Sequence, residues 1–528
     1  MIKEQRTIMT YTVENKTLAD LLEIAFSRYS DRPAFSALGQ TLSFSDIEEK
    51  SRSLAYWLQN ESGLETGDRV AIQLPNIAQY PIVVYAILRA GMVVVNTNPM
   101  YTDREIKHQL TDSGTKAIFI FQPVLPVFNK VKDQTSIERV IEVGATDLLT
   151  GHTELSIEGN QSFTDLVGIY ADKSLSKRSP ISETIVLQYT GGTTGVSKGA
   201  ELTNLNLVTH AEQVIDRFSN TCKPGHEIFI APLPLYHVYA FSVNLIVFAL
   251  QGNLSVLIPD PRDLDAFVKA IKPYKFTTFS GINTLLVGLS NHSGFRSLDF
   301  SNLKLTISGG ATLTTSAAEQ WYKLTGCTVS EGYGLSETSA ALCLNVPGQE
   351  EIGTVGLPLK DTIIDIRSEA GESLPDGQEG EVVAKAPQVM KGYWNRPEET
   401  QKVMTEDGFF RTGDIGKRMP SGTIKIVDRL KDLIIVSGFN VYPNEVEDVL
   451  TQHPGIVEAA VVSEPDERAG EKVCAYITAA QELNEEAIIE HCREHLTSYK
   501  IPKKLVVMDE LPKSTVGKIL RRELRTGM

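Results

Sequence analysis

The chain has 528 residues, of which 42% are hydrophobic and 22% charged, and its formal net charge at pH 7 is −15. This length exceeds what one hydrophobic core usually organises, so at least two domains are expected. The acidic excess argues against nucleic acid as a partner, because affinity for a phosphate backbone comes from clustered Lys and Arg. The five cysteines are widely spaced and form no C-x-x-C pair, so neither a disulfide framework nor a zinc site is indicated.

The N-terminal residues lack the pattern of an export signal. Residues 1–10 contain several charged and few apolar side chains, so the apolar core of a secretory signal is missing. The apolar stretches 81–95 and 241–250 are shorter than the roughly 20 residues that cross a membrane as a helix. We expect a cytoplasmic protein, and we leave open peripheral contact at the inner face of the membrane and a homodimer.

Most of the chain alternates short apolar runs with helical patterns, as the strands and crossover helices of an α/β protein do. Thr102 and Glu105 form a capping-box pattern that opens a helix, and Gly114 lies just past the end of that helix. Strands are predicted at 116–121, 184–188 and 227–230.

After Arg429 the predicted strands and helices follow one another more closely, which indicates a small α+β domain of about 100 residues. We place the domains at 1–428 and 429–528, with a hinge at about 428–431. The elements expected in the second domain are strands at 433–436, 457–462, 473–477 and 505–508 and helices at 443–453 and 484–496.

The segment Tyr189–Gly199 is rich in Gly and Thr and follows a predicted strand. Glycines let backbone N–H groups turn toward an anion, Thr hydroxyls add donors and a lysine adds positive charge, so the segment predicts a phosphate-binding loop. It is not a Walker A loop, because that motif has Gly before its lysine and Ser or Thr after it. From composition alone a flexible turn is the alternative. The candidate residues are Thr190, Gly191, Gly192, Thr193, Thr194, Gly195 and Lys198.

A second glycine turn spans Glu331–Thr338. Its aromatic ring can stack on a purine and its carboxylate can hold Mg²⁺, although a surface turn with an incidental Glu is the alternative. Another glycine turn follows the predicted strand 303–307. The candidate residues of the two turns are Glu331, Gly332, Tyr333, Gly334, Glu337, Thr338, Gly309, Gly310 and Ala311.

The pattern of the third segment, Asp407–Lys431, predicts a hairpin-like stretch. Asp414 is expected in a glycine-flanked turn, where a carboxylate, which only accepts hydrogen bonds, can take both ribose hydroxyls. Arg429 suits the same nucleotide. A charged loop between strands is the alternative.

These segments, in this order, resemble the acyl-adenylate-forming (AMP-binding) enzyme superfamily, and within it most of all the bacterial long-chain fatty-acid–CoA ligases. The resemblance covers essentially the whole chain and is clearest in Tyr189–Gly195 and Val436–Glu445. Departures include Ser197, where the family usually has Pro, and Asn204, where many members have His. The resemblance implies an α/β fold with a large multi-sheet N-terminal domain and a small mobile α+β C-terminal domain.

The resemblance also implies roles for the motif residues. The loop at 190–198 would bind the ATP phosphates, and the turns at 309–311 and 331–334 would contact adenine, with Tyr333 at the base. Glu337 would hold Mg²⁺. Asp414 and Arg429 would bind the ribose side of the nucleotide.

Four more residues gain roles from the resemblance alone. Lys518 would reach the α-phosphate and the carboxylate, Lys431 would be the hinge, Gly438 would line the pantetheine tunnel, and His237 would border the acyl carboxylate. Their alternatives are a solvated basic helix, an exposed linker lysine, a plain turn and a core histidine.

The expected activity is ATP-dependent ligation of a fatty acid to coenzyme A through an acyl-adenylate, with Mg²⁺ as cofactor and Lys518, Glu337, Lys198 and His237 as catalytic residues. A fatty-acyl-AMP ligase that loads an acyl carrier protein and a non-catalytic acyl or nucleotide binding protein remain alternatives. The acyl pocket is expected along 236–242, 279–283 and 338–344.

Overall fold

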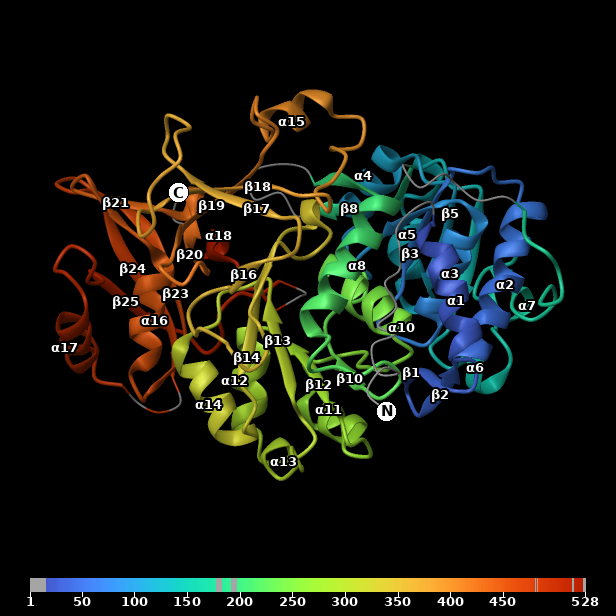
Figure 1. The fold of residues 1–528 in the computed structure, drawn as a ribbon, viewed down its shortest axis with the longest axis horizontal. Helices are drawn as coiled ribbons and strands as arrows, with labels where there is room; N and C mark the ends of the chain where they lie inside the picture. Colours follow the sequence, from blue (N-terminus) through green and yellow to red (C-terminus); the bar gives the residue numbers. More distant parts are fainter. Residues whose placement is uncertain are drawn as a thin grey trace, which may run out of the picture. The chain divides into compact units, whose positions relative to one another are not determined.

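The computed structural model describes residues 16–176, 183–190, 197–479, 481, 483–514 and 517–525. They form two compact units that are not contiguous in sequence (Figure 1). The first unit comprises Met1–Pro259, Ser336–Ala340 and Pro387–Thr400, and the second comprises Asp260–Leu335, Ala341–Ala386 and Gln401–Met528.

The first unit contains a seven-stranded sheet, counted over the described residues, in which only the pair β8–β9 is antiparallel. Buried apolar residues fill its strands, as expected for a sheet covered on both faces. In sheet order the strands are β7 (Gln161–Ser162), β6 (Arg139–Val143), β5 (Ala117–Phe121), β3 (Arg69–Gln73), β4 (Val93–Asn96), β8 (Thr184–Thr190) and β9 (Lys198–Thr203). A further run consists of β10 (Ile228–Ala231), β11 (Leu254–Leu257), β1 (Pro33–Ala37) and β2 (Gln40–Ser43).

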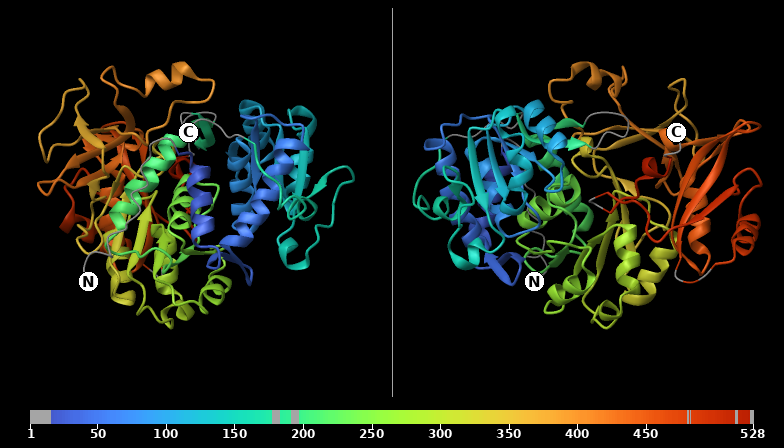
Figure 2. Two further views of the ribbon diagram at one scale, coloured as in Figure 1. Left: turned by 45° about the vertical axis from the view of Figure 1, so that its right-hand side comes forward. Right: turned by 180° about the vertical axis from the view of Figure 1, so that it is seen from behind.

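The helices of the first unit pack in part on one another, with α2 against α3 as the most extensive pair (Figure 2). The longer ones are α1 (Leu18–Arg28), α2 (Phe44–Asn60), α3 (Gln79–Ala90), α4 (Asp103–Ser113) and α8 (Asn204–Phe218). The short ones are α5 (Leu125–Asn129), α6 (Asp147–Thr150), α7 (Phe163–Leu166), α9 (Val238–Ala240), a π-helical turn (Phe241–Val247) and α10 (Phe248–Leu250), and α15 (Pro397–Lys402) begins in this unit.

The second unit contains three sheets among its described residues. The first has the order β16 (Leu357–Pro358), β15 (Cys343–Leu344), β14 (Val329–Tyr333), β13 (Leu305–Gly309) and β12 (Thr278–Gly281). The second is antiparallel, with β17 (Ile363–Arg367), β18 (Gly380–Lys385), β19 (Phe410–Arg418) and β20 (Ile424–Arg429). The third consists of β22 (Phe439–Val441), β21 (Ile434–Val436), β24 (Gly470–Ala479) and β23 (Ile456–Asp466), with β25 (Lys504–Val507) beside β24.

The helices of the second unit cover two of these sheets. Helices α12 and α14 pack together beside β13 and β14, and α16 packs on β23 (Figure 1). The buried core under α16 and α17 includes Val446, Leu450, Val461 and Ile488. The helices are α11 (Leu264–Ile271), α12 (Asn283–Asn291), α13 (Ser293–Arg296), α14 (Thr315–Thr325), α16 (Pro443–Gln452), α17 (Glu485–His495) and α18 (Arg521–Leu524).

The α/β fold class predicted from the sequence is confirmed, and so is the capping box of α4. Glu105 N–H donates to the Thr102 hydroxyl, Thr102 N–H donates to the Glu105 carboxylate at 2.9 Å, and Gly114 ends the helix with φ of 60°. This positive φ is the left-handed conformation that glycine adopts without a steric penalty. Among the described helices, none combines the length and apolar character that a membrane crossing requires.

Two local predictions differ from the structure. Asp414 lies inside strand β19 and not in a turn, because that strand continues through a register shift at Ile415 and Gly416. The turn expected at Gly438 belongs to a hairpin whose return strand, β22, was not predicted. Ser437 and Gly438 both have positive φ, as a tight two-residue hairpin turn requires. The division into domains at 428–431 stays a prediction.

Gly356 provides a direct test of local packing in the second unit. Its φ is +74°, and a Cβ built there would lie 2.3 Å from the backbone nitrogen of Asn345. We expect Gly356→Ala to lower the free energy of unfolding by about 3 kcal/mol, because backbone strain and a backbone clash add together. Gly371→Ala is the matched control: φ is +82° but nothing lies within 4 Å of the new Cβ. It should cost only about 1–2 kcal/mol. Equal shifts of the two urea midpoints would contradict this packing.

Candidate active site

Two of the predicted glycine turns lie side by side at the carboxyl ends of neighbouring parallel strands. Gly309 of β13 is the cross-strand partner of Gly332 of β14, and Ser308 is the partner of Glu331. Ligands in open α/β sheets bind at this edge, where the loops that follow the strands converge. Gly310 and Ala311 follow β13 directly, Tyr333 ends β14 and Gly334 follows it, so all seven predicted residues of 309–311 and 331–334 share this strand edge. On the other side of β14, Gly332 pairs with Leu344 of β15, and a Cβ at Gly332 would lie 2.3 Å from Leu344 Cδ2, so a side chain there would require Leu344 to move.

Tyr333, Asp414 and Arg429 form one hydrogen-bonded group in the second unit. The Tyr333 hydroxyl donates to Asp414 Oδ2 at 2.6 Å, and Arg429 Nε lies 2.7 Å from Asp414 Oδ1. Asp414 and Arg429 are cross-strand partners in β19 and β20. Burial raises the pKa of the Asp414 carboxyl, and the Arg429 guanidinium opposes that shift. A carboxylate accepts about four hydrogen bonds, so Asp414 can also bind hydroxyls of a ligand.

Lys518 lies in the same unit, next to the Gly310 turn. A Cβ added at Gly310 would lie 3.4 Å from Lys518 Cε, so the side chain passes close to that backbone. Burial lowers the pKa of the Lys518 ammonium to about 8, with Arg429 adding to the shift and Asp414 opposing it. The loop closes on itself, because Ser514 N–H donates to the Lys518 carbonyl at 2.7 Å. The structure therefore gathers Gly310, Asp414, Arg429 and Lys518, which are far apart in sequence.

Arg521, which was not singled out in the sequence, anchors the terminal segment. Its guanidinium lies 2.7 Å from the Glu447 carboxylate of α16 and donates to Asn444 Oδ1 at 2.5 Å. It also lies 3.6 Å from Asp428 and 3.5 Å from Asp432. The basic pair Arg521-Arg522 after Lys518 was the available signal, but it gives no partner. The arrangement holds α18, and with it the Lys518 loop, in place.

The first unit contains a second group of predicted residues. Lys198 Nζ lies 2.9 Å from Glu399 Oε2 and 4.7 Å from the centre of the Tyr393 ring. The Tyr393 hydroxyl donates to Glu337 Oε1 at 2.7 Å. Burial and the nearby Glu337 carboxylate raise the pKa of the Tyr393 hydroxyl, so it stays protonated and donates. Lys198 thus lies over the ring of Tyr393, and Glu337 accepts a hydrogen bond from its hydroxyl.

Tyr393 and Glu399 were both missed in the sequence. They lie in Gly392–Thr400, a stretch of closely spaced aromatic and charged residues, which was the available signal. The stretch is fixed to strand β9 by backbone hydrogen bonds, including Trp394 N–H to the Gly199 carbonyl at 2.8 Å. This pairing sets Tyr393 and Glu399 beside Lys198.

The predicted phosphate loop is described only at its two ends. Thr190 ends β8, Lys198 begins β9, and the two residues are antiparallel partners, so the loop connects the strands of a hairpin. The predicted residues Gly191, Gly192, Thr193, Thr194 and Gly195 lie outside the described residues.

The other predicted residues occupy separate positions. In the first unit, His237 caps α9, and its Nδ1 accepts Tyr239 N–H at 3.4 Å, while Thr338 is buried in a short 3₁₀ turn. In the second unit, Lys431 lies in the 3₁₀ turn Leu430–Asp432, and burial lowers the pKa of its ammonium. Gly438 lies in the β21–β22 turn.

Comparisons with known proteins identify the family of the chain. The family model for AMP-binding enzymes matches residues 22–394, and the model for the C-terminal domain of AMP-binding enzymes matches residues 445–518. A long-chain-fatty-acid–CoA ligase of Escherichia coli O6:H1 is 42% identical, over 97% of this chain and 94% of the relative. A protein of the same name from Bacillus subtilis is 36% identical, over 97% of this chain and 94% of the relative.

A solved structure has the same fold. The structure of ATP-bound MatB from Rhodopseudomonas palustris superimposes with a TM-score of 0.85 at 28% identity. The superposition covers 96% of this chain and 98% of the MatB chain.

Glu331 provides a pH-dependent test of the strand edge. Burial raises the pKa of its carboxyl to about 8, although Leu313 N–H donates to it at 3.1 Å. Because the folded pKa exceeds the unfolded value of about 4.3, the folded state retains the proton longer, and stability falls as pH rises from about 4.3 to about 8.

Glu331→Gln removes this titration. We expect the melting temperature of the variant, relative to the wild type, to rise with pH by roughly 3 °C or more between pH 5 and pH 8.5. Glu319→Gln, on the exposed face of α14, is the matched control and should give a flat difference. A flat difference for Glu331→Gln as well would show that this carboxyl is not held neutral by burial.

Proposed function

Because the chain belongs to the AMP-binding enzyme family, we propose that it is a long-chain fatty-acid–CoA ligase. The observation that carries this proposal is the 42% identity to a long-chain-fatty-acid–CoA ligase over 97% of the chain. The reaction joins a fatty acid to coenzyme A at the expense of ATP and releases AMP and pyrophosphate. The fatty acid, ATP and CoA are its small-molecule substrates.

The nucleoside of ATP binds at the carboxyl ends of β13 and β14. Tyr333 contacts the base together with the turn Gly309–Ala311, and Asp414 accepts the ribose hydroxyls. Three contacts support this assignment: the pairing of Gly309 with Gly332, the Tyr333–Asp414 hydrogen bond and the Asp414–Arg429 ion pair. Burial raises the pKa of the Asp414 carboxyl, Arg429 lowers it, and the ionised carboxylate accepts hydrogen bonds through both oxygens.

The phosphates bind at the loop between Thr190 and Lys198. In the free protein, Glu399 neutralises the Lys198 ammonium at 2.9 Å. A triphosphate carries more negative charge than one carboxylate, so Lys198 exchanges Glu399 for phosphate oxygens when ATP binds. The exchange keeps the lysine paired in both states.

Glu337 is the residue we assign to Mg²⁺. Its carboxylate is buried, and oxygen ligands of this kind are what Mg²⁺ prefers. The Tyr393 hydroxyl fixes the orientation of the carboxylate through Oε1. When bound, Mg²⁺ neutralises charge on the phosphates of ATP.

The reaction then proceeds in two steps. The fatty-acid carboxylate, which is ionised at neutral pH and needs no base, attacks the α-phosphorus. The bond from the α-phosphorus to the bridging oxygen breaks, and pyrophosphate leaves with the electron pair. Lys518 stabilises the negative charge that develops on the α-phosphate, as a preorganised cation in a partly desolvated site. His237 orients the carboxylate.

In the second step the thiolate of CoA attacks the acyl carbon and AMP leaves. We assign the passage of the thiol arm to the turn at Gly438 and the reorientation of residues 429–528 to a hinge at Lys431. A positive φ of 82° at Gly438, with nothing within 4 Å of a built Cβ, supports an open backbone turn there. The acyl chain is assigned to 236–242, 279–283 and 338–344.

The decisive assay measures pyrophosphate release from ATP across acids from acetate to oleate, with and without CoA. We expect release to peak with long acids and to yield AMP and acyl-CoA. If acyl-AMP forms and CoA does not accelerate turnover, the acceptor is an acyl carrier protein. If no acid gives pyrophosphate, the protein only binds its ligands.

Lys518→Ala tests the assigned cation. Pyrophosphate release with a long acid should fall by roughly 100-fold, the usual scale for removing one stabilising group from a developing oxyanion. Lys513→Ala is the matched control, because Lys513 lies on the same loop but pairs with Glu458 at 2.8 Å. Equal activity of the two variants would remove Lys518 from the catalytic assignment.

Tyr393→Phe tests whether this tyrosine positions Glu337. Loss of the hydroxyl leaves the carboxylate without its fixed orientation, so the Mg²⁺ concentration for half-maximal rate should rise roughly tenfold. The maximal rate at saturating Mg²⁺ should change much less. Tyr322→Phe, on an exposed face of α14, is the control. An unchanged Mg²⁺ dependence, or a loss of rate that Mg²⁺ does not restore, would contradict the positioning role.

A further inference from the structure

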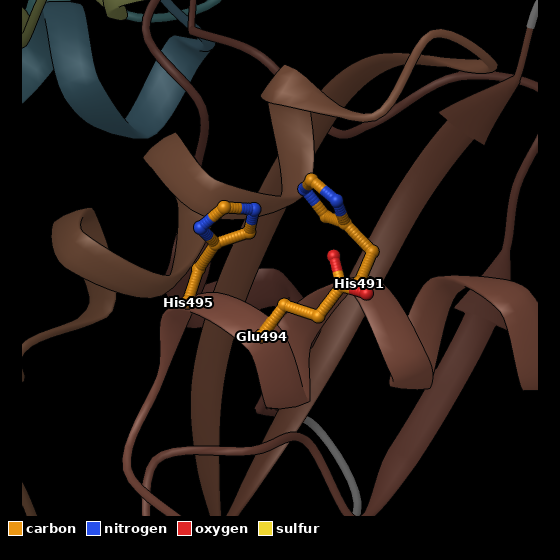
Figure 3. A group of neighbouring side chains, drawn as sticks. All are labelled: His491, Glu494 and His495. Carbon is orange, nitrogen blue, oxygen red and sulfur yellow. The ribbon is translucent and has the colours of Figure 1, made fainter.

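Helix α17 carries a cluster of metal-ligating side chains that the proposed ligase reaction does not use. Glu494 and His495 lie three and four residues after His491, so both project near the face of the helix that carries His491 (Figure 3). One ligand atom from each residue lies within 4.8 Å of the corresponding atoms of the other two. The His491 ring is half-buried, and the other two side chains are exposed.

A hydrogen bond fixes the orientation and the proton of His491. Its Nε2 lies 2.9 Å from the backbone carbonyl of Val449 in α16. A carbonyl oxygen only accepts, so Nε2 carries the proton and, in the neutral ring, Nδ1 carries the lone pair. Histidines that bind metals usually donate their other ring N–H to a carbonyl or carboxylate in this way. His491 is therefore prepared as a ligand before any ion arrives.

The groups around the cluster do not oppose a cation. The Arg493 guanidinium, the nearest positive charge along the helix, is paired with Glu490 at 2.8 Å. Cys492 faces the core, and burial raises the pKa of its thiol to about 11, so no thiolate competes. His453, at the end of α16, lies with its ring centre 5.6 Å from that of His491, and its Nδ1 accepts Gly455 N–H. Burial and the neighbouring His491 both lower the pKa of the His453 imidazole.

We propose that His491, Glu494 and His495 bind one divalent transition-metal ion of the Zn²⁺ class. Two imidazoles and one carboxylate suit Zn²⁺, Cu²⁺ or Ni²⁺, whereas Mg²⁺ prefers oxygen ligands alone. Three protein ligands leave a fourth position for water.

Small side-chain rotations complete the site. Ligands about 2.0–2.2 Å from a tetrahedral ion lie roughly 3.5 Å from one another. The observed spread of up to 4.8 Å exceeds this by about the reach of one torsion change. Glu494 and His495 are exposed and can rotate toward the fixed His491, and the His495 ring already lies edge-on to the His491 ring, with ring centres 4.8 Å apart.

The solvent exposure of the ligands also limits the chemistry that the metal site can support. Two of its three ligands face solvent, so no water-excluded pocket surrounds the ion, and we infer a binding site without a second catalytic activity. A bound ion links two turns of α17 and adds to the contact of His491 with α16. An ion that binds only the folded state stabilises it by an amount that grows with the logarithm of the ion concentration once that concentration exceeds the dissociation constant.

The test is isothermal titration of the full chain with Zn²⁺ alone at pH 7.5, in the absence of nucleotide and in excess Mg²⁺. We expect saturable binding of one Zn²⁺ per chain. Glu494→Gln and His495→Ala should each weaken that affinity by about tenfold or more, the scale seen when even an outer-shell partner is lost. Both side chains are exposed, so neither change should disturb folding, and circular dichroism verifies this.

His152→Ala is the matched control, because His152 is also exposed but lies in the first unit, far from α17 in sequence. It should bind Zn²⁺ like the wild type. At pH 5.5 the wild type should bind much more weakly, because protonated imidazoles cannot ligate. Absence of saturable binding, displacement by Mg²⁺, or equal affinity of the two ligand variants and the wild type would each overturn the proposal. None of these outcomes depends on the ligase reaction.

Discussion

The cost of burying charge is the constraint on which the predicted site depends. A charge removed from water is tolerated only when it is paired or neutralised. Four charged groups of the site meet this condition in different ways. Asp414 is paired with Arg429, Lys198 with Glu399, and Glu337 with the Tyr393 hydroxyl. Glu331 retains its proton instead, with a pKa of about 8.

The same constraint explains how the free protein stays folded around a site built for a polyanion. A phosphate site needs cations, and unpaired cations destabilise a fold in the absence of ligand. Glu399 supplies a temporary partner for Lys198, and Asp414 faces the cluster that contains Arg429 and Lys518. In the proposed function, ATP is recognised by exchanging partners within an existing set of charges, which avoids the penalty of exposing and reburying them.

Local patterns in the sequence predicted what local physics determines. The capping box of α4 was readable because Thr102 and Glu105 satisfy each other within one helical turn. The strands β5, β8 and β10 were readable from their short apolar runs. Asp414 was misplaced because flanking glycines suggest a turn, whereas pairing with β18 and β20 keeps that stretch extended. Strand β22 (Phe-Asn-Val) has no continuous apolar run, unlike the equally short β21 (Ile-Ile-Val), so its residues carry no strand signal.

The partners of the site residues could not be predicted in this way. Lys198 and Glu399 are 201 residues apart, and Arg521 and Glu447 are 74 apart, so their pairing exists only in the folded chain. The metal-ligating residues of α17, in contrast, lie close together in the sequence. Their spacing was present in the sequence, but the search for zinc ligands considered cysteines only, and the Val449 carbonyl that orients His491 comes from another helix.

The measurement that tests the central claim most directly traces labelled oxygen from the fatty acid into the products. A long-chain acid labelled with ¹⁸O in both carboxylate oxygens is converted in the presence of ATP, CoA and Mg²⁺, and the products are analysed by mass spectrometry. Attack of the carboxylate on the α-phosphorus predicts that AMP gains one labelled oxygen and acyl-CoA keeps the other. Unlabelled AMP, with the label in pyrophosphate or inorganic phosphate, would contradict an acyl-adenylate and with it the assignment of this site.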